Sequence, residues 1–159
     1  MTRTSFSRCI LAMLLLTGAR TAQAQLRDTK ALTLDGARNI MSASDAEARR
    51  NGWTVAIAVV DPSGSIVLFQ RADGARPSNV DFALRKARTA AHYQRPTKAL
   101  DSAVTAGRIQ WLATDALPIE GGIPIVVNGQ VIGAVGVSGA TSAQDAQVAA
   151  AGIAALIVK

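Results

Sequence analysis

The segment from Glu120 to Ala146 constrains the fold most, because it is rich in both glycine and β-branched residues. Two strand-like runs, IPIVV and QVIGAVGVS, are joined by Asn128-Gly129. This dipeptide is among the strongest local signals for a two-residue hairpin, since both turn positions need a positive φ. The segment therefore predicts two neighbouring antiparallel strands.

The glycines of the second run are spaced at every third residue, at Gly133, Gly136 and Gly139. A dinucleotide site needs G-x-G-x-x-G between a strand and a helix, and a P-loop needs G-x-x-x-x-G-K-[ST]. Neither spacing occurs, so nucleotide binding is excluded. A glycine inside a strand marks a bulge or a close approach of backbone or ligand. Two interpretations stay open: a tightly packed sheet, or a flat ligand or neighbouring subunit lying on this face.

The first half of the chain predicts one helix followed by a strand pair. The helix begins after Thr33 and runs to about Arg50, with Asn51-Gly52 as its stop signal. WTVAIAVV (53–60) and SIVLFQR (65–71) are strand-like, with a turn over 61–64. The first strand alternates bulky residues with alanines, which predicts one bulky face and one face that another element approaches closely.

The second half adds three helical patterns. Pro77 and Ser78 suit the start of a helix over 79–93, and Pro96 ends it; a shorter helix within 97–113 is broken at Gly107. The segment 114–122 is expected to be irregular, with at most a short strand. The last helix covers 141–156, with Ser142 and Asp145 as a pair resembling a capping box. This order of elements predicts an α+β fold in which an antiparallel sheet packs against helices.

The N-terminus has the pattern of a secretory signal peptide. Arg3 and Arg8 precede an apolar run that is too short to span a bilayer, and Ala22-Gln23-Ala24 is a small-x-small cleavage site. We expect residues 1–24 to be removed and residues 25–159 to form a single domain. The mature chain is then expected to be periplasmic or secreted, with no integral membrane segment.

Loss of that leader also changes the composition. It takes away three arginines and no acidic residue, which lowers the formal net charge from +6 to +3 and weakens the case for nucleic-acid binding. The only cysteine, Cys9, leaves as well, so no disulfide or thiolate nucleophile remains. One histidine and no cysteine argue against a zinc site. Ser138 stands in GVSG, which does not match the G-x-S-x-G nucleophile motif.

Several short stretches occur in an order that carries a family resemblance. They are LTLDGA (32–37), IAVVDPSG (57–64), RADGA (71–75), KARTA (86–90), GGIPI (121–125) and GAVGVSG (133–139) followed by QDAQVA. Together they resemble the GlcG/HbpS-like family of small haem-binding proteins, whose domain also ends PduO-type proteins. The resemblance implies a profilin-like antiparallel sheet of about five strands flanked by helices, and assembly into homo-oligomers. It also implies haem binding, with haem capture, sensing or degradation as the role.

Few residues of the mature chain can ligate haem iron, which takes His, Met, Cys or Tyr as its usual axial ligands. They are His92, Tyr93 and Met41, and Met41 is expected in the core. His92 is the candidate metal ligand, and an ordinary surface histidine at a helix C-terminus is the alternative. The resemblance adds Thr89, since some members of the family are thought to use a weak oxygen ligand.

The helix carrying these candidates is basic. The haem propionates are expected to pair with Arg85, Arg88, Arg95 or Lys98. Arg88 shares a helical face with His92. Lys86 belongs to a family motif and is expected near the ligand. The ligand is haem or another small planar molecule. A small-molecule catabolic enzyme that uses Lys86 with Asp73 or Glu120 for acid–base chemistry is the alternative function. A third hypothesis is an assembly protein accessory to a membrane sensor or transporter.

Overall fold

The computed structural model describes residues 29–156, which fold into four α-helices, a 3-10 helix and four strands. In chain order these are α1 (Leu34–Arg50), β1 (Ala56–Val60), β2 (Ile66–Arg71), α2 (Pro77–Tyr93), α3 (Thr97–Thr105), η1 (Ile109–Ala113), β3 (Gly122–Val127), β4 (Gln130–Ser138) and α4 (Ser142–Ala154). The predicted signal peptide, residues 1–24, lies outside the described residues. No helix within 29–156 has the length and apolar character needed to cross a membrane.

The strands form one antiparallel sheet in the order β2-β1-β4-β3. The α+β prediction is confirmed, but the expected count of about five strands is wrong for the described chain, which has four. The segment 114–121 is irregular, as expected, and side chains of α2 and α3 take up two of its backbone N–H groups. Leu117 N–H donates to Thr89 Oγ1 at 2.9 Å, and Glu120 N–H donates to Asp101 Oδ2 at 3.1 Å. The profilin-like description stays a prediction.

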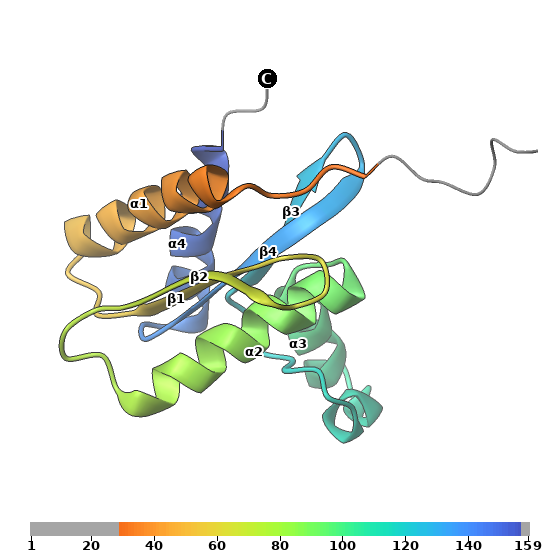
Figure 1. Ribbon diagram of the computed structural model, residues 1–159. Helices are drawn as coiled ribbons and strands as arrows, with labels where there is room; N and C mark the ends of the chain where they lie inside the picture. The colour runs from red at the N-terminus through yellow and green to blue at the C-terminus, as the bar shows by residue number, and fades with distance from the viewer. Residues whose placement is uncertain (1–28, 157–159) are drawn as a thin grey trace, which may run out of the picture.

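Helices cover both faces of this sheet (Figure 1). α1 and α4 pack together on one face, and α2 crosses the other face with α3 beside it. The alternation in β1 has the predicted effect. Val55, Ile57 and Val59 join the bulky core under α1 and α4, while the opposite face packs small residues against α2. That second core consists of Ala56, Ala58, Val60, Ala83, Ala87, Ala90, Ala91 and Ala134.

The local signals for turns and caps act mostly where the sequence places them. Thr33 caps α1 by accepting from Gly36 N–H at 3.1 Å. Asn128 and Gly129 have φ values of 52° and 78°, as the hairpin requires. The cap of α4 differs from the prediction by one residue: its capping box is formed by Thr141 and Gln144. Asp145 makes a different contact, described below.

The glycines of β4 are explained by tight packing. A Cβ atom at Gly136 would lie against the backbone of α2, 2.9 Å from Ala87 Cα and closer still to the carbonyl oxygen of Ala83. A Cβ at Gly122, the residue paired with Gly136 on β3, would meet the backbone of Lys86. The row of small residues therefore lets α2 lie directly on the sheet. The tight-packing interpretation is confirmed at this position.

Candidate functional site

Five of the six predicted ligand-binding residues line one cavity along the second half of α2. The cavity has a volume of about 240 Å³ and is lined by Arg85, Arg88, Thr89, His92, Tyr93 and Asp115, the last coming from the segment before β3. We call it the α2 cavity. Residues 85, 88, 89 and 92 are neighbours on a helix because of their three- and four-residue spacings. The fold therefore places these five residues around one cavity and adds Asp115, which no sequence motif indicated.

His92 is held by the turn that joins β1 to β2. Its Nε2 lies 2.9 Å from the carbonyl oxygen of Ser63, so this nitrogen is the donor. Nδ1 is then the nitrogen with a free lone pair. The close approach depends on Gly64, where a Cβ atom would stand 2.6 Å from His92 Nε2. A metal-binding histidine usually donates its other ring N–H to a carbonyl or carboxylate, which is the arrangement seen here.

The two arginines of the α2 cavity are placed at its solvent side. Arg88 is exposed, and its Nε donates to the carbonyl oxygen of Gly64 at 3.0 Å. Arg85 is also exposed, one helical turn earlier. A guanidinium group pairs well with carboxylates because its N–H groups match their geometry. The cavity therefore combines a histidine nitrogen with two cationic groups at its rim.

Thr89 and Tyr93 are the other candidate oxygen ligands, and both already make hydrogen bonds. Thr89 is buried, and its Oγ1 accepts from Leu117 N–H. The Tyr93 hydroxyl donates to Asp115 Oδ1 at 2.9 Å, and its ring contacts Trp111 edge-on at 5.5 Å between centroids. Ligation by Tyr93 would require this hydrogen bond to break, whereas ligation through His92 Nδ1 leaves the hydrogen bonds of the cavity in place. His92 is therefore the favoured ligand on geometry.

Lys86 does not lie with the other five residues. It is 2% exposed, and its ammonium group donates to Asp145 Oδ2 at 2.8 Å and to the carbonyl oxygen of Val137 at 3.0 Å. Asp145 is equally buried and also accepts from Ala140 N–H at 3.0 Å. Burial raises the pKa of Asp145 above the ordinary aspartate value, although the hydrogen bond and charge of Lys86 oppose that rise. This buried ion pair joins α2 to the start of α4.

The GGIPI stretch packs directly on that ion pair. A Cβ atom at Gly121 would stand 2.8 Å from Lys86 Nζ and 2.9 Å from the Asp145 Cβ. Gly121 also has a φ of 125°, which L residues rarely adopt. Three of the stretches that carry the family resemblance, KARTA, GGIPI and QDAQVA, thus meet at one place. In this chain the three stretches together form and enclose the buried ion pair, which is a structural role.

The other two residues of the enzyme alternative lie apart from Lys86. Glu120 pairs with Lys98 at 2.9 Å, on the surface near α3. Asp73 and Arg71 are both exposed at the end of β2. In the described part of the chain, none of Glu120, Asp73 and Arg71 lines the cleft that includes Lys86. The structure therefore does not assemble the acid–base group Lys86, Asp73 and Glu120.

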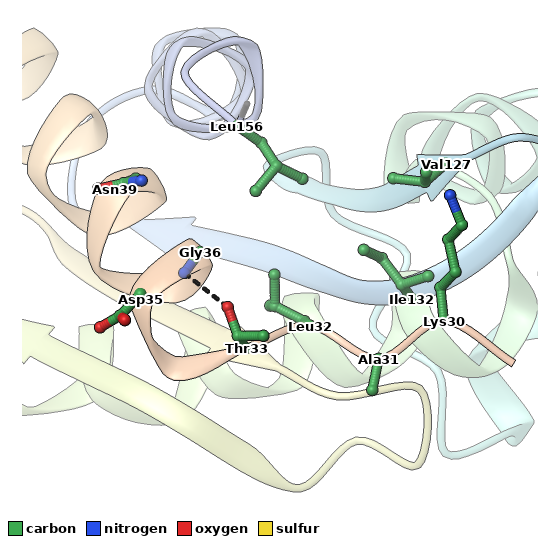
Figure 2. A pocket seen from close by; sticks show the side chains of 10 residues that line it. All are labelled: Lys30, Ala31, Leu32, Thr33, Asp35, Gly36, Asn39, Val127, Ile132 and Leu156. Carbon is green, nitrogen blue, oxygen red and sulfur yellow. Dashed lines mark hydrogen bonds between the residues drawn. The ribbon is translucent and has the colours of Figure 1, made fainter. Parts of the chain in front are cut away.

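A larger cavity, with a volume of about 690 Å³, lies between the N-terminal segment, β3, β4 and the end of α4. Figure 2 shows Leu32, Ile132 and Leu156 pointing into it, with Lys30 and Asp35 nearby. None of the described residues that line it is His, Met, Cys or Tyr. Haem iron placed there would lack an ordinary axial ligand from this lining. As a site for haem iron, the α2 cavity is therefore favoured over the larger cavity, because only the α2 cavity of the two has His and Tyr in its lining.

The whole domain matches a known protein family. Residues 32–154 match the family described as "Haem degrading protein HbpS-like". The chain belongs to the HbpS-like family. The resemblance drawn from the sequence motifs is therefore confirmed, and the match covers every described helix and strand.

Individual relatives of this HbpS-like protein are similar to it in sequence and in structure. Protein GlcG of Escherichia coli K12 is 46% identical over 100 residues, which are 62% of this chain and 75% of GlcG. A double mutant of Streptomyces reticuli HbpS superposes with a TM-score of 0.78 at 32% identity, covering 87% of this chain and 95% of that one. The PduOC–haem complex superposes with a TM-score of 0.75 at 26% identity, covering 82% and 98%.

Sequence reasoning missed the partners of the candidate residues. Ser63, Asp115 and Asp145 contact His92, Tyr93 and Lys86 across 29, 22 and 59 residues of chain. The presence of Asp145 in the QDAQVA stretch was a signal that it mattered, but nothing indicated its partner. Trp111 was also missed; its Nε1 is buried without a hydrogen-bond partner among residues 29–156.

The turn that holds His92 is itself held by Asp61, which gives a pH prediction. Asp61 Oδ1 accepts from the hydroxyl and N–H groups of Ser63 and from Ser65 N–H. The Ser63 hydroxyl, helped by these amides, lowers the pKa of Asp61. A carboxylate whose pKa is lower in the folded state contributes stability at pH values above its unfolded pKa of about 3.9. This stability is lost as pH falls through the folded-state pKa.

We expect Asp61→Asn to be less stable than the wild type at pH 7, with the difference in stability shrinking below about pH 4. Thermal unfolding at several pH values measures it, and a difference independent of pH would contradict it.

Proposed function

We propose that this protein binds haem in the α2 cavity, with Nδ1 of His92 as the iron ligand. The observation that carries the proposal is the hydrogen bond from His92 Nε2 to the Ser63 carbonyl. It orients the imidazole and leaves the second nitrogen free, as in histidine metal ligands generally. The family description supports haem as the ligand, and so does the solved complex of the related PduOC with haem.

The other residues of the cavity have consistent roles in this proposal. Arg85 and Arg88 pair with the propionates, and Thr89 or Tyr93 supplies the alternative oxygen ligand. At about 240 Å³ the α2 cavity is smaller than a haem, so part of the porphyrin lies on the protein surface. When bound, the haem iron supplies ligand exchange or redox chemistry. The protein residues orient the group and balance its carboxylate charges.

The biological setting follows from the same reasoning. We infer a secreted or periplasmic protein that takes part in haem capture, sensing or degradation. The leader pattern of residues 1–24 and the family description support this inference. A surface-exposed porphyrin is protected when a second subunit covers it, which is consistent with the homo-oligomer that the resemblance implies. The profilin-like description of the fold belongs to the same inference.

A titration of residues 25–159 with hemin tests the proposal. We expect a saturable change of the Soret band at one haem per subunit, or one per two subunits. His92→Ala should weaken binding about tenfold or more, because loss of a metal ligand costs at least as much as loss of its outer-shell partner. Arg85→Ala should weaken binding less, through one propionate contact.

Two control variants test whether weaker hemin binding is specific to loss of His92 and of the cavity arginines. Tyr93→Phe removes only the hydroxyl and should bind like the wild type if His92 is the ligand. Arg49→Ala, an exposed arginine on α1, should also bind like the wild type. A Soret change that is lost in Tyr93→Phe and kept in His92→Ala would overturn the assignment of His92. Absence of a saturable change in the wild type would overturn haem binding itself.

A further inference from the structure

A second built site lies between the N-terminal ends of α2 and α4. This cleft of about 250 Å³ is lined by Arg76, Asn79, Phe82, Ile119, Ser138 and Ser142, with Lys86 and Asp145 at its floor. We call it the α2–α4 cleft. It shares no lining residue with the α2 cavity. Its volume is slightly below the roughly 300–1,000 Å³ of typical ligand pockets, so it suits a small molecule.

Two polar residues that line the cleft are largely buried, but their side chains make no hydrogen bond to the described chain. Asn79 is 8% exposed and Ser138 is 7% exposed. Neither side chain makes a hydrogen bond to another residue within 29–156, although the side chains of Lys86 and Asp145 beside them do. Among residues 29–156 only Trp111 Nε1 is fully buried without a partner, so the polar atoms of Asn79 and Ser138 remain accessible from the cleft. Asn79 and Ser138 therefore supply donors and acceptors to whatever fills the cleft.

The charges around the cleft favour an anion. The α2 N-terminus has no side-chain cap and no acidic residue in its first turn. Ser142 is the first residue of α4, so a second helix N-terminus borders the same space. Helix N-termini carry partial positive charge. The N–H groups of the α2 terminus have no side-chain cap, whereas the capping box of Thr141 and Gln144 already satisfies two N–H groups at the α4 terminus. Arg76 adds a full charge at the rim. Asp145 is the only acidic lining residue, and Lys86 balances it at 2.8 Å.

The cleft also has an apolar wall. Phe82 is 38% exposed, and Ile119, from the segment before β3, lines the same cleft. A ligand with a hydrocarbon part would cover these two side chains and remove apolar surface from water. The combination of apolar wall, arginine and unpartnered amide and hydroxyl groups is typical of a small-ligand site.

We propose that the α2–α4 cleft binds a small organic carboxylate. The carboxylate lies between Arg76 and the N-termini of α2 and α4, Asn79 and Ser138 donate hydrogen bonds to it, and the hydrocarbon part rests on Phe82 and Ile119. The Lys86–Asp145 pair forms the floor and keeps the two helices at the correct separation. The site is independent of haem binding, because no residue serves both cavities.

Benzoate is a suitable probe, with benzamide and benzylamine as neutral and cationic molecules of similar shape. Amide ¹H–¹⁵N spectra of residues 25–159 are recorded during titration with each. We expect benzoate to shift the Ser78, Asn79 and Ser142 signals saturably, benzamide to bind more weakly and benzylamine not to bind. Arg76→Gln should weaken benzoate binding about tenfold and Asn79→Ala about fivefold, since a charged hydrogen bond contributes more than a neutral one.

Arg108→Gln is the matched control, an exposed arginine that does not line the cleft. It should bind benzoate like the wild type, and hemin titration of Arg76→Gln should be unchanged. Equal binding of the three probes would overturn the proposal. So would shifts confined to the α2 cavity near Arg85 and Arg88, or wild-type affinity in Arg76→Gln. Arg76 is exposed, so its variant gives a result even if Asn79→Ala does not fold.

Discussion

Gly136→Ala is expected to lower the free energy of unfolding by about 3 kcal/mol or more, or to prevent folding. The reason is the contact between β4 and α2. A Cβ atom at residue 136 would overlap the carbonyl oxygen of Ala83 and stand 2.9 Å from Ala87 Cα. These are backbone atoms of a helix and cannot rotate away as a side chain can. The helix would have to move off the sheet and open the alanine core.

Gly107→Ala is the control for this prediction. No atom lies within 4 Å of the position that its added methyl group would take, but Gly107 has a φ of 92°, so only backbone strain is added. That strain costs about 1–2 kcal/mol. Chemical denaturation followed by circular dichroism compares the two variants. A loss in Gly136→Ala no larger than that in Gly107→Ala would show that α2 does not lie on β4 as described.

Lys86→Met is expected to cost about 3–5 kcal/mol, because it leaves the Asp145 carboxylate buried without its cation. The loss should be smaller in acid. Burial raises the pKa of Asp145, and removal of Lys86 raises it further. A raised folded-state pKa gives stability that is present below the unfolded value and is lost as pH rises through the folded-state pKa. The variant should therefore be closest to the wild type near pH 4 and fall behind it toward neutral pH.

Three further variants separate the ion pair from simple loss of packing. Adding Asp145→Asn to Lys86→Met removes the unpaired charge and keeps the hydrogen bond from Ala140 N–H, so it should recover much of the loss. Lys98→Met breaks an exposed pair with Glu120 and should cost less than about 1 kcal/mol. Asp145→Asn is also measured alone. If the double variant loses as much stability as Lys86→Met and Asp145→Asn lose in sum, the coupling between Lys86 and Asp145 is contradicted.

The α2 cavity and the α2–α4 cleft are lined by different parts of the basic helix α2. Its second half presents His92 and two arginines to one space, and its first turn presents Asn79 to another. Lys86 lines the α2–α4 cleft, and its ammonium group is held in the ion pair with Asp145. The stability predictions and the binding predictions therefore concern different residues, and each can fail without the other.

Local features of this protein were determined by the sequence alone. Thr33, Pro77 and the Asn128-Gly129 pair set helix starts and a hairpin through their own backbone preferences, which act within a few residues. The alternation in β1 set which face would be bulky. The four-residue spacing of Arg88 and His92 placed both on one side of a helix.

The tertiary structure decided which faces meet. Lys86 and Asp145 are 59 residues apart, and no local pattern distinguishes a cation that faces solvent from one that faces a buried carboxylate. The same holds for Gly136 under α2. It also holds for Thr89 and Asp101, whose side chains accept from two N–H groups of the irregular segment 114–121. Pairing across the chain depends on the packing of whole elements, because burial and desolvation arise only when two surfaces come together.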